Sequence, residues 1–135
     1  MSEFNDRVVA EFRANGGWVE TGGFGDALVL IHSIGARSGR ERVNPAMSLV
    51  DGPDRLVIAS AAGAEANPGW YHNLRVQPDA TIETAEGMVA VTAVELDGED
   101  YRQAWARFDA ASPAFAEYQR RAGSRRLPIL RLRTG

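Results

Sequence analysis

The feature that most limits the possible folds of this chain is a set of six short runs rich in apolar and β-branched residues. Segments that favour turns separate them. Runs of this length and composition are typical of strands rather than helices. They cover residues 27–33, 42–50, 55–60, 80–84, 88–95 and 127–132. Tight turns at 51–54 and 85–87 join neighbouring runs as hairpins, and strands joined by hairpins are antiparallel. We therefore predict a mainly β (α+β) fold in which six strands close into a barrel.

Four helical segments interrupt these runs instead of alternating with them, which argues against a parallel α/β sheet. They are expected at residues 5–15, 69–76, 98–111 and 113–122. The first has Phe4, Val8 and Phe12 at a spacing of four, as on one helix face. The expected N-caps of the first three helices are Asn5, Asn67 and Asp97. A length of 135 residues predicts one domain, with an N-terminal helical part at 1–16.

The composition excludes several kinds of chemistry. The chain has no cysteine, which rules out disulfides, thiol nucleophiles and iron–sulfur clusters. All 15 basic residues are arginine, so Schiff-base chemistry on lysine is also excluded. We interpret His32 as structural and His72 as structural or a candidate general acid, and we expect no metal site. No apolar run approaches the roughly 20 residues of a membrane span and no signal peptide is evident, so a cytoplasmic location is expected.

Charge is distributed unevenly along the chain. Residues 1–119 hold nine arginines and all 18 acidic residues, whereas residues 120–135 hold six arginines and no acid. This basic end favours an anionic ligand or surface nearby. A solvated basic segment without a ligand is the alternative.

A second arginine-rich segment, residues 33–42, lies between two predicted strands. It contains Gly35, Arg37, Ser38, Gly39, Arg40 and Arg42. Glycines let backbone N–H groups approach a ligand, and guanidinium groups match phosphate oxygens in pairs. Since no helix follows, the segment is neither a Walker loop nor a dinucleotide fingerprint. It predicts a phosphate site, with a polar hairpin loop as the alternative.

Two further segments are candidates for lining a pocket. Within residues 60–74, a loop of small residues leads into a helix, so a flat ring system has room beside Trp70. Trp70 and Leu74, four residues apart, equally fit the core face of that helix. Phe115 and Tyr118 share one face of the last helix and either line a pocket or cover the barrel.

Several short motifs occur in one order along nearly the whole chain, and together they resemble those of the deazaflavin-dependent nitroreductase family. The similarity covers about residues 12–132. The motifs are Gly35-Ala36-Arg37-Ser38-Gly39, Arg42-Val43-Asn44-Pro45, Ala59-Ser60, Asn67-Pro68-Gly69-Trp70-Tyr71-His72-Asn73-Leu74, Tyr118-Gln119 and Arg126-Leu127-Pro128. The resemblance implies a split β-barrel of the FMN-binding-like type. It also implies coenzyme F-420, a deazaflavin with a phosphate and a polyglutamate tail that transfers hydride.

The same resemblance implies which residues bind the cofactor. The positions matched to the phosphate are Arg37 and Ser38, with the loop backbone at Gly39, and the position toward the tail is Arg42. The positions matched to the ring are Asn44, Pro45, Ala59, Ser60, Trp70 and Asn73. FMN is the alternative cofactor, because an arginine loop suits either phosphate.

The substrate half departs from the family pattern, so we do not transfer nitroimidazole reduction to this chain. Alanine stands at Ala36 and Ala61, where the nitroreductases have basic residues, and Tyr118 is the one pocket tyrosine retained. The other pocket positions fall at Met47 or Ser48, Ser112 and Phe115. We predict hydride transfer to a small, largely apolar electrophile, a quinone, an enone or an aromatic.

Residue roles follow from that expectation. Ser48, Phe115 and Tyr118 are expected to line the substrate pocket beneath a helical cover at 112–126, and Ser60 or Tyr118 to supply a proton.

Three alternatives remain open: an FMN-binding reductase of the same fold, a non-catalytic deazaflavin carrier, and a polyanion or membrane-surface binder using the basic end. No nucleic-acid partner is expected, and the sequence is compatible with peripheral membrane contact and with either a monomer or a homodimer.

Overall fold

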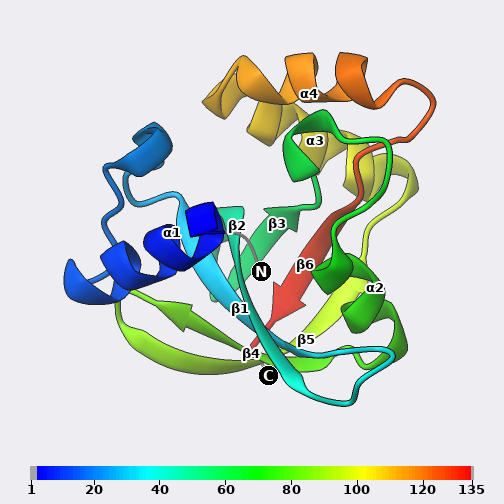
Figure 1. The fold of residues 1–135 in the computed structure, drawn as a ribbon. Coiled ribbons are helices and arrows are strands. Elements are labelled where there is room, and N and C mark those ends of the chain that lie inside the picture. Colours follow the sequence, from blue (N-terminus) through cyan, green and yellow to red (C-terminus); the bar gives the residue numbers. More distant parts are fainter. Residues whose placement is uncertain (1–2, 135) are drawn as a thin grey trace.

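The six predicted strands form a barrel in the computed structural model, which describes residues 3–134. All neighbouring strands pair antiparallel in the order β1-β2-β3-β6-β5-β4, and β1 also pairs with β4, which closes the barrel (Figure 1). The strands are β1 Leu28–Ile34, β2 Glu41–Asp51, β3 Asp54–Ile58, β4 Asp79–Thr84, β5 Gly87–Glu95 and β6 Ile129–Arg133. The two predicted hairpins are confirmed, between β2 and β3 and between β4 and β5.

Helices at the four predicted places flank the barrel. They are α1 Glu3–Ala14, α2 Gly69–Val76, α3 Gly98–Ala111 and α4 Ala114–Ala122, with short 3-10 turns η1 Thr21–Gly23 and η2 Ala61–Gly63. The predicted N-caps agree less well with the structure than the helices do. Asn5 lies inside α1, which already includes Glu3. Pro68 holds the cap position of α2, and the Asn67 side chain instead accepts a hydrogen bond from Arg125. Asp97 precedes α3 as predicted, but its side chain makes no capping bond.

Side chains of β1 alternate between two hydrophobic clusters. Val29 and Ile31 belong to the barrel interior, whereas Leu28 and Leu30 pack on the outside against α1, where Phe12 is buried. This alternation is the two-residue period of an extended strand. Because both faces are covered, β1 reads as a continuous apolar run in the sequence.

The strand β3 alternates in the same way on the other side of the barrel. Val57 lies in the interior cluster, and Leu56 and Ile58 pack outside with Phe108 of α3 and Phe115 of α4. Each such fully buried side chain stabilises the fold by about 1.5–3 kcal/mol. Two helical layers, α1 and the α3–α4 pair, are thereby fixed to the outside of the barrel (Figure 1).

The helix α2 packs into the interior cluster of the barrel. Trp70, Tyr71 and Leu74 are at most 5% exposed and belong to the same cluster as the inward-facing strand residues. The prediction that Trp70 and Leu74 form the core face of this helix is confirmed. Met47 on β2 contacts both outer clusters, so this part of β2 lies between the two helical layers.

His32, interpreted as structural, lies on β1 between two acidic side chains. Its ring nitrogens are 3.1 Å from Glu41 and 2.7 Å from Glu83, and Arg13 of α1 also pairs with Glu83 at 2.5 Å. The cluster ties α1 to β1 and β4, which supports the structural interpretation.

Candidate functional site

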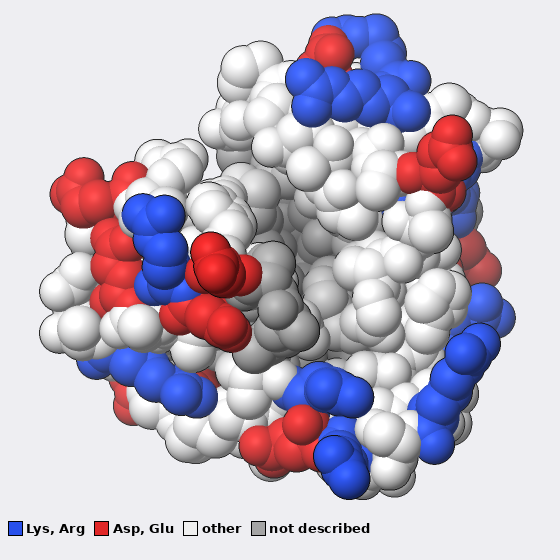
Figure 2. Space-filling model, viewed as in Figure 1, with Lys and Arg blue, Asp and Glu red and all other residues white. Residues whose placement is uncertain are grey.

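Two adjoining cavities make up the candidate site. The first, here called the apolar cavity, has a volume of about 410 Å³ and lies between α1, β2, η2, α2 and α4. The second, the arginine cavity, has a volume of about 700 Å³ and lies between the β1–β2 loop and α2. Asn44, Gly69 and Trp70 line both, so the cavities share a wall. The face shown in Figure 2 is hollowed between the two helical layers, with most charged side chains around its periphery.

The arginine cavity is built on the loop between β1 and β2. Arg37, Ser38 and Arg42 line it, and no acidic residue does so among the part of the chain that the structure describes. The loop closes through a hydrogen bond from the Gly35 N–H to the Arg40 carbonyl at 2.7 Å. A Cβ at Gly35 would lie 2.6 Å from Ser38 Oγ, so only glycine lets the serine hydroxyl approach this closely.

Asn73 of α2 lines the same cavity and holds the loop in place. Its buried side chain bonds the Ala36 backbone N–H and the Ser33 hydroxyl. His72, the next residue toward the N-terminus, is exposed and also lines the arginine cavity. The cavity therefore combines two guanidinium groups, a hydroxyl and an imidazole, a donor set suited to an anion.

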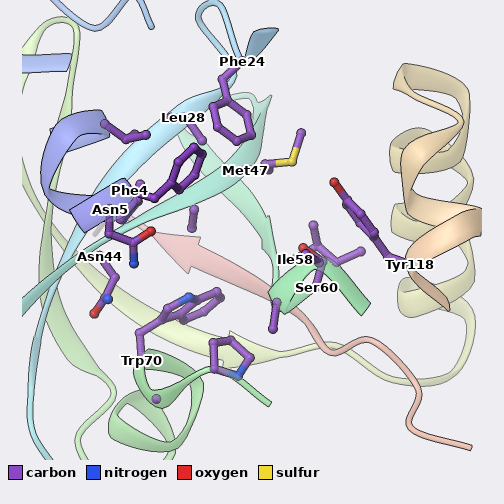
Figure 3. A pocket seen from close by; sticks show the side chains of 17 residues that line it. Phe4, Asn5, Phe24, Leu28, Asn44, Met47, Ile58, Ser60, Trp70 and Tyr118 are labelled. Carbon is purple, nitrogen blue, oxygen red and sulfur yellow. The ribbon is translucent and has the colours of Figure 1, made fainter. Parts of the chain in front are cut away.

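The apolar cavity has walls from opposite sides of the fold. Figure 3 shows Phe4 of α1 and Phe24 on one side and Tyr118 of α4 on the other. The polar side chains on its walls are those of Asn5, Asn44, Ser60 and Tyr118, and no charged residue lines it among residues 3–134. Such a cavity suits a neutral, flat molecule with one or two hydrogen-bonding atoms.

Most of the predicted site residues come together at these cavities. Those lining the arginine cavity are Arg37, Ser38, Arg42 and Asn73; those lining the apolar cavity are Pro45, Ser60 and Tyr118; and Asn44 and Trp70 line both. Four of the predicted residues line neither cavity, within the described chain.

These four residues have other positions. Gly39 turns the loop at a φ of +69°, and Ala59 is fully buried. The Ser48 hydroxyl donates to the Ala27 carbonyl at 3.0 Å, and Phe115 packs edge-on against Phe108 with ring centres 5.3 Å apart. The expectation that Ser48 and Phe115 line the substrate pocket is therefore corrected, because their side chains are used in packing and bonding behind the walls.

The sequence reasoning missed the contribution of α1 and the segment after it. Phe4, Val8 and Phe24 line the apolar cavity, and the rings of Phe4 and Phe24 meet edge-on at 6.4 Å. The four-residue spacing predicts one apolar face of a helix and carries no sign of a cavity. Phe4 at the first position of that stripe is 47% exposed, so the stripe extends from the core to the cavity mouth.

The residues present fit coenzyme F-420. Its anionic phosphate and tail suit the two arginines and the serine of one cavity, and its flat ring suits the uncharged walls of the other. The described residues contain no group of three His, Asp or Glu side chains able to hold a metal ion. None of the described helices has the length and apolar character needed to cross a bilayer.

Comparisons with known proteins agree with this geometry. A family model described as F420H(2)-dependent quinone reductase matches residues 5–133. The F420H(2)-dependent quinone reductase Rv1261c of Mycobacterium tuberculosis is 33% identical over 105 residues, which are 76% of this chain and 70% of that protein.

Two solved structures are also similar. One is an F420-H2 dependent reductase, FDR-A, with a TM-score of 0.71 and 30% identity over 78% of this chain and 93% of its own. Another, described as a domain-swapped dimer, has a TM-score of 0.73 and 28% identity, covering 94% of this chain and 96% of its own. The expected resemblance to deazaflavin-dependent reductases is confirmed, and the matching family is one named for quinones. This chain belongs to the F420H(2)-dependent quinone reductase family.

Proposed function

We propose that this protein binds coenzyme F-420 across both cavities and reduces a quinone held in the apolar cavity. One observation carries the proposal: a cavity with two arginines adjoins an uncharged cavity through Asn44, Gly69 and Trp70. A cofactor that is anionic at one end and flat at the other can occupy both at once. The family match supports the same cofactor and acceptor.

Each cavity has a separate task in this proposal. Arg37 and Ser38 bind the phosphate, and Arg42 lies toward the tail. Trp70 and Asn44, on the shared wall, border the ring. Because the rest of the apolar cavity is uncharged, it favours a neutral acceptor beside the ring.

The protein also has to provide a proton. When bound, the reduced cofactor supplies a hydride, and a quinone that takes up this hydride and one proton becomes a hydroquinone. Ser60 and Tyr118 carry the hydroxyl groups that line the apolar cavity. Either hydroxyl can donate a hydrogen bond to the quinone oxygen on which charge develops, and pass its proton on.

Equilibrium binding of coenzyme F-420, FMN and FAD, measured side by side by fluorescence, tests the cofactor assignment. We expect the deazaflavin to bind most tightly. The purified protein is then mixed with the reduced coenzyme and a quinone, an enone or a nitroaromatic, and cofactor oxidation is followed by absorbance. Faster oxidation with the quinone supports the proposal. Tight binding of coenzyme F-420 without its oxidation by any acceptor would identify the protein as a carrier. Tighter binding of FMN would mean that FMN, and not coenzyme F-420, is the cofactor.

The solved relative described as a domain-swapped dimer supports a homodimer rather than a monomer for this chain. Light scattering after size-exclusion chromatography tests this part of the proposal. A single domain over residues 1–135 and a cytoplasmic location stay predictions of the sequence.

A further inference from the structure

The guanidinium group of Arg125 donates four hydrogen bonds to the loop that follows β3. Nε donates to the Ala64 carbonyl at 2.9 Å, and Nη2 to the Ser60 carbonyl at 2.8 Å. Nη1 donates both to the Ala59 carbonyl at 3.1 Å and to the Asn67 side-chain oxygen at 2.6 Å. One side chain therefore joins four points of the segment between residues 59 and 67.

Arg125 makes these bonds without a carboxylate partner. No acidic side chain among residues 3–134 lies within ion-pair distance of it. The side chain is partly buried, and burial lowers the pKa of its guanidinium group. A cation placed against neutral carbonyl groups is costly unless its donors are satisfied, and four of the five guanidinium N–H groups donate to this loop.

The loop that Arg125 holds is a wall of the apolar cavity. Ser60, Ala61 and Ala62 line that cavity. Ala61 and Ala62 have φ angles of +47° and +52°, and no other non-glycine residue between 3 and 134 has a positive φ. Alanine adopts this left-handed conformation only where surrounding contacts impose it. The four hydrogen bonds of Arg125 flank these two residues and provide such contacts.

The segment that contains Arg125 is also bonded to α4, the helix that carries Tyr118. Gln119 of α4 donates to the Arg125 carbonyl at 2.8 Å and accepts from the Leu127 N–H at 3.1 Å. The helix also lies directly on the loop, because a Cβ at Gly63 would be 2.8 Å from the Tyr118 carbonyl oxygen. Residue 125 is thus bonded through its side chain to the Ser60 loop and through its backbone to the helix that carries Tyr118.

We propose that Arg125 is a positioning residue for quinone reduction, which sets how Ser60 and Tyr118 lie relative to each other at the apolar cavity. The inference rests on the proposed function, since it takes this cavity as the acceptor site. Arg125 itself does not line either cavity. It acts through the two elements it joins, the loop that carries Ser60 and the helix that carries Tyr118.

The test compares Arg125→Met and Arg125→Lys with the neighbouring substitution Arg126→Met. Arg126 is exposed, stacks on Tyr101 at 3.9 Å and does not bond the loop, so it controls for loss of charge in the same segment. Thermal midpoints, binding of coenzyme F-420, and kcat and KM for a soluble naphthoquinone are measured at a temperature where each variant is folded.

We expect Arg125→Met to lower kcat by about 10- to 100-fold, the usual consequence of a small displacement of groups around reacting atoms. Cofactor affinity should change far less, because the phosphate and tail bind at the arginine cavity. Arg125→Lys should also lose kcat, since a point charge cannot bond four acceptors spread around a planar fork. Arg126→Met should keep the wild-type kcat.

A wild-type kcat in both folded Arg125 variants would overturn the inference, as would an equal loss in Arg126→Met. If Arg125→Met fails to fold, Arg125→Lys decides by the same measure. Hydrogen exchange gives a readout that needs no cofactor: residues 59–64 should lose protection in Arg125→Lys, and unchanged protection would overturn the inference. Failure of the wild-type protein to bind coenzyme F-420 would instead overturn the proposed function.

Discussion

The side-chain oxygen of Asn73 accepts a hydrogen bond from the backbone N–H of Ala36 across 2.9 Å, joining α2 to the loop of the arginine cavity. The amide nitrogen of the same side chain donates to Ser33 Oγ at 3.1 Å. Asn73 is only 8% exposed, so water does not readily replace either partner. Helix and loop are therefore held together by one buried amide.

Asn73→Ala should weaken both the fold and cofactor binding. The substitution leaves the Ala36 N–H and the Ser33 hydroxyl without their partner, which costs about 1–3 kcal/mol of unfolding free energy. Urea denaturation measures that loss, and fluorescence titration with coenzyme F-420 measures the affinity. Asn15→Ala, at an exposed position after α1, is the matched control and should change neither. Full cofactor affinity in Asn73→Ala would mean that the loop keeps its shape without α2.

Arg37→Ala should weaken binding of coenzyme F-420 by about 1.5–3 kcal/mol, the range for a hydrogen bond to a charged group. Arg40 lies in the same loop, is exposed and does not line either cavity, so Arg40→Ala removes an equal charge outside the site. Dissociation constants measured at low and high salt separate a direct contact with the phosphate from a long-range effect of charge. Salt screens the long-range attraction strongly and the direct contact much less. Equal losses in both variants, or none in Arg37→Ala, would place the phosphate elsewhere.

The strands and helices could be predicted because their signals are local. An extended strand repeats every two residues, and the turns at 51–54 and 85–87 carry residues that favour tight reversals. The pairing of β1 with β4, which closes the barrel, joins segments about 50 residues apart and has no local signal. The resemblance to a known family supplied that part.

The direction of single side chains could not be predicted in the same way. Met47 lines the apolar cavity, but Ser48, one residue later on β2, faces the other way and bonds Ala27. Phe115 and Tyr118 are neighbours on α4, yet the packing of α3 covers the first and leaves the second at the cavity. Both outcomes depend on where an element sits relative to its neighbours, which a sequence pattern does not specify.

The ionised Glu83 carboxyl should stabilise the protein at neutral pH, and this contribution should be lost in acid. The hydrogen bond from Arg13, and after it the one from His32, keeps the pKa of the Glu83 carboxyl below its ordinary value of 4.5. A carboxyl whose folded pKa is depressed contributes stability that is fully present above its unfolded pKa and lost as the pH falls through the folded one. Glu83→Gln should therefore lower the unfolding free energy at pH 7 by on the order of 1 kcal/mol, with the difference from wild type shrinking below about pH 4.

Urea denaturation at several pH values measures this effect. Glu86→Gln, at an exposed position in the turn between β4 and β5, is the control and should follow the wild type throughout. A Glu83→Gln deficit that stays constant down to pH 3 would assign the loss to packing rather than to the ion pair.

Tyr118→Phe should lower kcat for quinones while leaving the affinity for coenzyme F-420 nearly intact. The ring of Tyr118 is fixed at 6.2 Å from the centre of the Phe115 ring, and phenylalanine keeps that contact, so the change removes little more than the hydroxyl at the cavity. If this hydroxyl supplies the proton, its loss should cost about 100-fold in kcat.

Tyr101→Phe is the control, because the Tyr101 hydroxyl donates to the Leu127 carbonyl at 2.7 Å, outside both cavities. That variant should lose about 1 kcal/mol of stability with an unchanged kcat. Ser60→Ala, assayed beside them, separates the two candidate donors, since only the variant lacking the true donor should lose the larger factor. A Tyr118→Phe protein that loses thermal stability but keeps its kcat with every quinone would show that Tyr118 only packs α4 onto η2.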